Sequence, residues 1–203
     1  MEKINQSNKK IMFWFLVILN LIMSITDLVL TYIGSSDLSI EANPLVYLLN
    51  FSWKSLIITS IIFLVVIVVL LYYAFFRFKR IVIQCERFKQ YISMLFFNRP
   101  DKFIWALYKF PKNKIGLSYL GASLGCVLAI VIPIGKLFVA FLWIGIINNL
   151  NIVNSYHNYF NVFVLPFGGR SDLTIGGIIL ALFVWYYWFL KEYRINKKTL
   201  EIG

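Results

Sequence analysis

The chain has 203 residues, of which 60% are hydrophobic, 18% aromatic and only 14% charged, and its mean hydropathy is +0.76. This composition excludes an ordinary soluble domain and indicates a polytopic helical membrane protein. The formal net charge of +11 is better explained by lysine- and arginine-rich loops on one side of a membrane than by nucleic-acid binding, so no nucleic-acid partner is expected. We therefore expect a single all-α membrane domain over residues 1–203.

Four apolar stretches, 11–34, 55–76, 117–148 and 173–190, are long enough to cross a hydrocarbon core about 30 Å thick. The first follows a basic start, but it is too long for a signal-peptide core and lacks a small-x-small cleavage site, so we expect it to remain as a span. The third contains Pro133 and Gly135, which predicts a kinked or tilted helix. The alternative is a break into two half-length helices.

Lysine and arginine are distributed very unevenly among the connections. Seventeen of the twenty lie in the N-terminal tail, the 77–116 connection and the C-terminal tail, whereas 35–54 and 149–172 hold only Lys54 and Arg170. The positive-inside rule then predicts a multi-pass protein of the cell membrane with both termini cytoplasmic and 149–172 outside. The remaining basic residue, Lys136, lies in the third span at a depth similar to that of Asp27 in the first, so the two side chains could form an ion pair.

The first span carries a regular series of polar side chains. Asn20, Ser24, Asp27 and Thr31 follow one another at steps of three or four residues, which places them on one face of a helix. A carboxylate in hydrocarbon costs roughly 2.5–3.5 kcal/mol on insertion scales, so Asp27 needs a partner or a polar cavity. Polar side chains also bridge membrane helices without any ligand, and this structural interpretation stays open.

Both outer connections add polar groups on the side of the membrane toward which this stripe leads. The first contains Glu41 and Asn43 just before Pro44, and the second is rich in asparagine around His157. Asparagines of the second connection share one face if 150–162 is helical. The sequence thus predicts an outward-facing polar site with these candidate ligand-binding residues: Asn20, Asp27, Thr31, Glu41, Asn43, Lys136, Asn154, His157, Asn158 and Asn161.

Three functions are compatible with such a site. The first is binding or transport of a small polar ligand or cation. The second is a metal-dependent intramembrane hydrolase, because Asp27, Glu41 and His157 could hold a divalent metal ion that activates water, although no HExxH, paired CxxC or GxSxG motif is present. The third is a non-catalytic accessory subunit, whose partner is another chain of a membrane complex or a second copy of this one.

The 77–116 connection predicts a cytoplasmic amphipathic helix that lies in the headgroup plane. Its apolar residues share one helical face over 78–96, and the short piece 103–110 continues the pattern; the face consists of Phe78, Ile81, Cys85, Phe88, Ile92, Leu95 and Phe96. Each lysine or arginine near an anionic leaflet contributes about 1 kcal/mol, so we expect this connection to bind anionic lipids of the inner leaflet.

Part of the chain resembles a family of small bacterial and archaeal membrane proteins that is classified as a domain of unknown function. The resemblance covers about the first 75 residues and rests on Asp27-x-x-x-Thr31, Gly34, the string Glu41-Ala42-Asn43-Pro44-Leu45 and Lys54. It implies a membrane location and a shared polar motif, but no activity. Separately, His157-x-x-x-Asn161 is similar to one motif of the CAAX-processing type of intramembrane protease, whose paired-glutamate motif this chain lacks.

Overall fold

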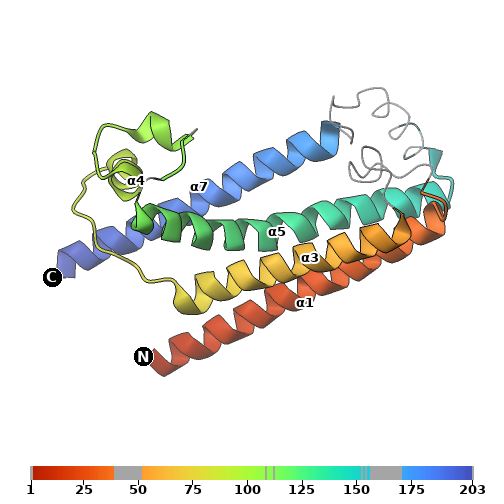
Figure 1. The fold of residues 1–203 in the computed structure, drawn as a ribbon, viewed down its shortest axis with the longest axis horizontal. Helices are drawn as coiled ribbons and strands as arrows, with labels where there is room; N and C mark the ends of the chain where they lie inside the picture. Colours follow the sequence, from red (N-terminus) through yellow and green to blue (C-terminus); the bar gives the residue numbers. More distant parts are fainter. Residues whose placement is uncertain are drawn as a thin grey trace. The chain divides into compact units, whose positions relative to one another are not determined.

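The computed structural model describes residues 2–38, 52–107, 109–111, 113–151, 153, 155 and 171–202. Within these ranges the chain is helical and contains no β-strand (Figure 1). The helices are α1 (Glu2–Gly34), α3 (Trp53–Tyr72), α4 (Phe88–Phe97), α5 (Lys114–Ile147) and α7 (Ser171–Ile202), with a π-helical turn η1 (Tyr73–Arg77) and a 3-10 turn η2 (Phe103–Leu107). The predicted all-α fold is confirmed.

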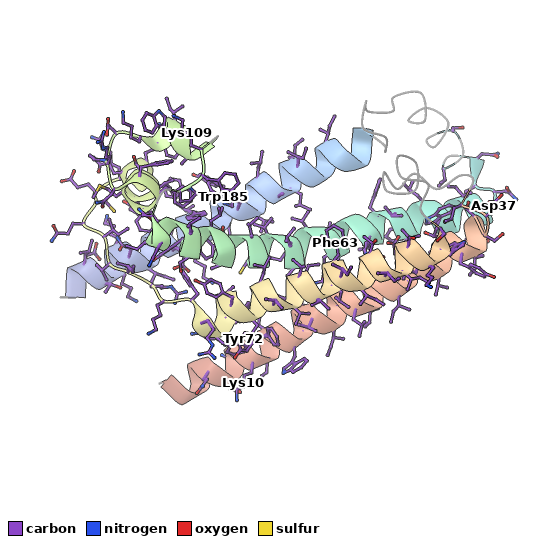
Figure 2. The ribbon with its side chains drawn as sticks, viewed as in Figure 1. Lys10, Asp37, Phe63, Tyr72, Lys109 and Trp185 are labelled. Carbon is purple, nitrogen blue, oxygen red and sulfur yellow. The ribbon has the colours of Figure 1, made fainter. Side chains whose placement is uncertain are left out.

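Four helices in the described ranges are long and apolar enough to cross a membrane: α1, α3 with η1, α5 and α7. The number and order of the predicted spans are therefore confirmed, and they support a multi-pass membrane protein. Many large apolar side chains of these helices are exposed, among them Phe63 of α3, which is labelled in Figure 2, as a lipid-facing surface requires. α1 begins earlier and α7 ends later than predicted, because lysine, glutamate and arginine at these ends are good helix formers that continue the apolar segments.

α5 continues without interruption through Pro133. The alternative of two half-length helices is therefore wrong for this span. A proline inside a helix lacks the N–H that would bond to the carbonyl four residues earlier, which here belongs to Ala129. Asn20 of α1 donates Nδ2 to Ala129 O at 2.9 Å. A side chain of a neighbouring helix thus supplies the hydrogen bond that Pro133 cannot make, and this is one way in which membrane helices accommodate proline.

The chain divides into two compact units, which we describe separately. The first takes Met1–Val68 and Ala129–Ala181, and the second takes Val69–Leu128 and Leu182–Gly203. In the first unit α1 and α3 are antiparallel, because Trp53 at the start of α3 donates Nε1 to Ser36 O, just beyond the end of α1, at 2.6 Å.

α1 and α5 run parallel within the first unit. Three contacts join residues that are 109 positions apart in sequence, and they recur every seven residues on both helices: Asn20 with Ala129, Asp27 with Lys136, and Gly34 with Trp143. A seven-residue recurrence keeps one face of each helix in contact, as in the left-handed packing of membrane bundles. In a chain of four consecutive spans, the first and third spans cross the membrane in the same direction. The parallel course of α1 and α5 agrees with this.

In the second unit α4 packs against the beginning of α5 and the later part of α7. The buried cluster consists of Tyr91, Ile92, Leu95 and Phe96 of α4, Tyr119 of α5 and Phe189 of α7. α4 is shorter than the predicted amphipathic helix, because 78–87 is not helical. The prediction of one helical face over 78–96 is therefore wrong for its first half, and the apolar side of α4 is buried against protein.

Candidate functional site

Polar side chains on α1 face α5 inside the first unit. We call this arrangement the polar seam, and it consists of Asn20, Ser24 and Asp27 on α1 with Ala129 and Lys136 on α5. The face of α1 that carries the seam is otherwise packed, since its buried residues recur at steps of three, four or eight: Phe13, Leu16, Asn20, Met23 and Thr31. Asp27 lies between Met23 and Thr31 on this face and is partly exposed.

Asn20 lies at the end of the seam nearer the N-terminus of α1 and is only 1% exposed. Its Nδ2 donates to Leu16 O at 2.8 Å and to Ala129 O at 2.9 Å, so both amide hydrogens are used and the orientation of the carboxamide is fixed. Among the described residues, Asn20 Oδ1 is buried without a hydrogen-bond partner. An unpaired buried acceptor costs about 1–3 kcal/mol, so a donor brought to this atom would be favourable.

Lys136 contacts two of the α1 side chains of the seam. Its Nζ donates to Ser24 Oγ at 3.0 Å and lies 3.4 Å from Asp27 Oδ2. The predicted pairing of Asp27 with Lys136 is therefore confirmed. The two side chains remain 27% and 21% exposed, respectively. Pairing lowers the cost of holding each charge within an apolar bundle, while the carboxylate keeps lone pairs that can accept further donors.

Beyond Asp27, toward the C-terminal end of α1, the two helices are tightly packed. Thr31, one turn beyond Asp27 on the same face, is 4% exposed. At Gly34 a Cβ atom would collide with the ring of Trp143, so the indole lies directly on the backbone of α1. Glycine is thus needed here for close approach, and Trp143 bounds the seam on α5.

Four of the predicted ligand-binding residues belong to the described part of the chain: Asn20, Asp27, Thr31 and Lys136. The structure places the first three on one face of α1, and brings Asn20 and Asp27 against α5. The other predictions lie outside the described residues: Glu41, Asn43, Asn154, His157, Asn158 and Asn161.

Of the three predicted metal ligands, only Asp27 belongs to the described part of the chain. The metal site therefore stays a prediction. Within the described ranges no group of three or more histidine, cysteine, aspartate or glutamate side chains could hold a metal ion.

The link between Asn20 and Pro133 was missed from the sequence, where Pro133 suggested only a kink. A signal was available. If Asp27 pairs with Lys136, one step of seven residues back along both parallel helices brings Asn20 opposite Ala129, which is four residues before the proline. Ser24 was noticed in the stripe but not as a partner of Lys136.

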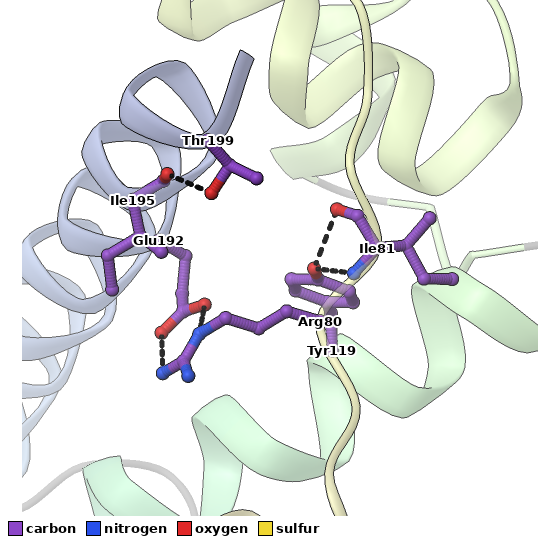
Figure 3. Close-up of polar contacts among 6 residues, drawn as sticks. All are labelled: Arg80, Ile81, Tyr119, Glu192, Ile195 and Thr199. Atoms are coloured by element: carbon purple, nitrogen blue, oxygen red, sulfur yellow. Dashed lines mark hydrogen bonds and ion pairs between the residues drawn. The ribbon is translucent and has the colours of Figure 1, made fainter. Parts of the chain in front are cut away.

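A second polar cluster holds the extended residues 78–87 in the second unit. Arg80 makes a bidentate ion pair with Glu192 of α7, with Nε–Oε2 at 2.6 Å and Nη2–Oε1 at 2.9 Å (Figure 3). Glu192 is 3% exposed, and its hydrogen bonds raise the pKa of the Arg80 guanidinium above its ordinary value. Tyr119 OH accepts from Ile81 N at 3.1 Å.

Two further residues of α7 bind the backbone of the same segment. Asn196 accepts from Ile83 N at 2.7 Å and donates to Ile83 O at 2.8 Å, and Tyr193 donates to Glu86 O at 2.5 Å. Side chains thereby take the place of helical hydrogen bonds, which explains why 78–87 is extended. Because the polar groups of this cluster bond to one another, its evident role is structural.

No protein-family model, curated protein or solved structure matches this chain. The resemblance of its first part to an uncharacterised membrane-protein family stays a prediction, and functional argument rests on the residues of the seam themselves.

Proposed function

We propose that this integral membrane protein binds a small polar ligand at the polar seam, as a binding or transport protein. The observation that carries the proposal is a pair of opposite charges, Asp27 and Lys136, that are close together yet about a quarter exposed within apolar helices. Asn20 Oδ1, on the same face of α1, adds a buried acceptor that has no hydrogen-bond partner among the described residues.

The charges indicate the chemistry of the ligand. Because the Lys136 ammonium lies 3.4 Å from the Asp27 carboxylate, a bare cation at Asp27 has to displace it. A small amphoteric molecule does not, since its cationic group can pair with Asp27 while its anionic group pairs with Lys136. Such a ligand exchanges one ion pair for two, which favours it over a lone metal ion.

Under this proposal the polar seam lies in the outer half of the membrane. The lysine and arginine distribution supports a cytoplasmic position for both termini, which would make α1 run outward. The parallel course of α1 and α5 supports the same direction for both spans. The ligand would then enter from outside.

A thermal-shift screen of the purified full chain tests the proposal. It compares amphoteric solutes, simple cations and simple anions on wild type and on the neutral pair Asp27→Asn/Lys136→Met. The matched control is Asp101→Asn/Lys102→Met, which removes an ion pair of the same 3.4 Å separation from the other unit.

We expect an amphoteric solute to stabilise the wild type and the control by about 2.7 kcal/mol at 100 times its dissociation constant, and to leave the neutral pair unchanged. Absence of any wild-type shift across the screen contradicts the proposal. An equal shift in the neutral pair would place the ligand elsewhere, and a shift with cations alone would overturn the amphoteric assignment.

A further inference from the structure

The short segment after α4 forms a projection of the second unit that the polar seam does not explain. We call residues 98–107 with 109–111 the cationic lobe. α4, which leads into it, packs through Tyr91 and Phe96 on Tyr119 of α5 and Phe189 of α7. Tyr119 lies near the beginning of α5, and Phe189 lies two residues before Lys191, where the apolar part of α7 ends. Because α5 and α7 are candidate spans, these contacts hold the lobe near the level where the apolar segments end.

Two large apolar side chains of the lobe are strongly exposed. Ile104 is 69% exposed and Phe110 is 81% exposed. They are not parts of a span, since one belongs to η2 and the other follows it. Exposed apolar tips beside basic residues are typical of segments that insert shallowly into a membrane interface.

Lysine side chains of the lobe gather around one indole. Lys102 Nζ lies 4.3 Å and Lys109 Nζ 4.1 Å from the ring centroid of Trp105, and Lys109 is labelled in Figure 2. Trp105 itself packs edge-on against Phe97 of α4, with centroids 6.0 Å apart. Attraction to the ring face holds both ammonium groups close to the exposed tips. Asp101, 3.4 Å from Lys102, offsets only part of this positive charge.

We propose that the cationic lobe docks on the anionic lipid leaflet at the side of the membrane where α5 begins. Ile104 and Phe110 enter the boundary between headgroups and acyl chains, and Lys102 and Lys109 bind lipid phosphates. Charge favours this occupant over a protein partner of mixed surface, because three basic residues and one acidic residue lie in the described lobe: Arg99, Lys102, Lys109 and Asp101. The packing of α4 on the beginning of α5 supplies the position.

A depth measurement tests the apolar contact. A fluorescent reporter is attached at Phe110→Cys in the full chain with Cys85→Ala and Cys126→Ala, in nanodiscs of phosphatidylglycerol and phosphatidylcholine with brominated acyl chains. The control reporter is at Lys198→Cys, an exposed position of the same unit. We expect quenching at 110 at least twofold stronger than at 198. Equal quenching at the two positions overturns the insertion of the lobe.

A lipid-selectivity measurement tests the charges and keeps both native cysteines. Full-length wild type, Lys102→Gln/Lys109→Gln and the control Lys197→Gln/Lys198→Gln are compared for retained phosphatidylglycerol over phosphatidylcholine. The control removes the same charge from exposed positions of α7. We expect the lobe variant to lose roughly fivefold selectivity for each lysine, and the control to lose much less. Equal losses in both variants, or none in the lobe variant, contradict a specific anionic-lipid surface.

Discussion

Asn20 Nδ2 lies 2.9 Å from Ala129 O, the carbonyl that Pro133 of α5 leaves without its helical partner. The second amide hydrogen goes to Leu16 O in the same helix as Asn20. Asn20 therefore supplies the hydrogen bond that α5 lacks and adds a second one to a carbonyl of its own helix, while its oxygen remains unpaired among the described residues. Asn20 thus stabilises the packing of α1 on α5 through its nitrogen and leaves its oxygen as an acceptor without a described donor.

A double-mutant cycle tests the structural role. Asn20→Leu keeps a similar volume but uncovers Ala129 O, and we expect it to cost about 1–3 kcal/mol of unfolding free energy. In a Pro133→Ala background residue 133 regains its N–H and can bond to Ala129 O, so the same change should cost measurably less. Reversible unfolding in mixed micelles measures all four proteins. Strictly additive losses would show that Asn20 and Pro133 do not act on the same carbonyl.

A second double-mutant cycle tests the ion pair between Asp27 and Lys136. Asp27→Asn leaves the Lys136 ammonium with Ser24 but without its counter-ion, and Lys136→Met leaves the Asp27 carboxylate without its described cationic partner. Each single change should destabilise the protein or lower its yield, and the double change should recover part of the loss, with a coupling of about 0.5–3 kcal/mol. If the double variant is as poor as the sum of the singles, the 3.4 Å contact has no energetic weight.

Two glycines of α5 make a matched pair for helix packing. A Cβ at Gly125 would lie 2.5 Å from Leu70 O, a backbone atom that cannot move aside, whereas a Cβ at Gly135 meets nothing within 4 Å. Gly125→Ala should therefore lower the thermal unfolding temperature. Gly135→Ala should raise stability, by up to about 1 kcal/mol, because alanine is the better helix former. A tolerated Gly125→Ala would mean that α3 and α5 do not approach so closely within the second unit.

Hydropathy and charge were sufficient to predict the four spans, because each is a long apolar run between polar connections. The Asp27–Lys136 pair was also predictable, since two opposite charges at similar depth in apolar segments favour pairing. The extended conformation of residues 78–87 could not be predicted from the sequence. These residues follow helical periodicity, but Asn196 and Glu192, more than a hundred positions away in sequence, bind that segment and override the local pattern.

The rate at which Cys85 reacts with maleimide tests whether residues 78–87 are held in their extended conformation. Partial burial raises the pKa of the Cys85 thiol above the ordinary value, so less thiolate is present at a given pH and maleimide labelling should reach half its limiting rate at a higher pH than for a free thiol. Asn196→Leu removes both hydrogen bonds to Ile83 and the long contact from Asn196 Nδ2 to Cys85 Sγ at 3.7 Å. Loss of the sulfur contact alone would move the midpoint up, but we expect the exposure of Cys85 to dominate and to move the midpoint down. The experiment uses a Cys126→Ala chain.

Thr199→Val is the control on the same helix, because Thr199 bonds to Ile195 O of α7 itself (Figure 3). An equal change of midpoint in both variants would argue that Asn196 does not hold the extended segment.

The location of a bound ligand tests the central claim most directly. A high-resolution structure in nanodiscs, with the solute that stabilises the wild type, should show ligand density in contact with Asp27 and Lys136. The separation of Asp27 Oδ2 and Lys136 Nζ should exceed the 3.4 Å of the unliganded pair, because polar groups of the ligand insert between them. Ligand density elsewhere, with the pair still closed, would contradict a binding site at the polar seam.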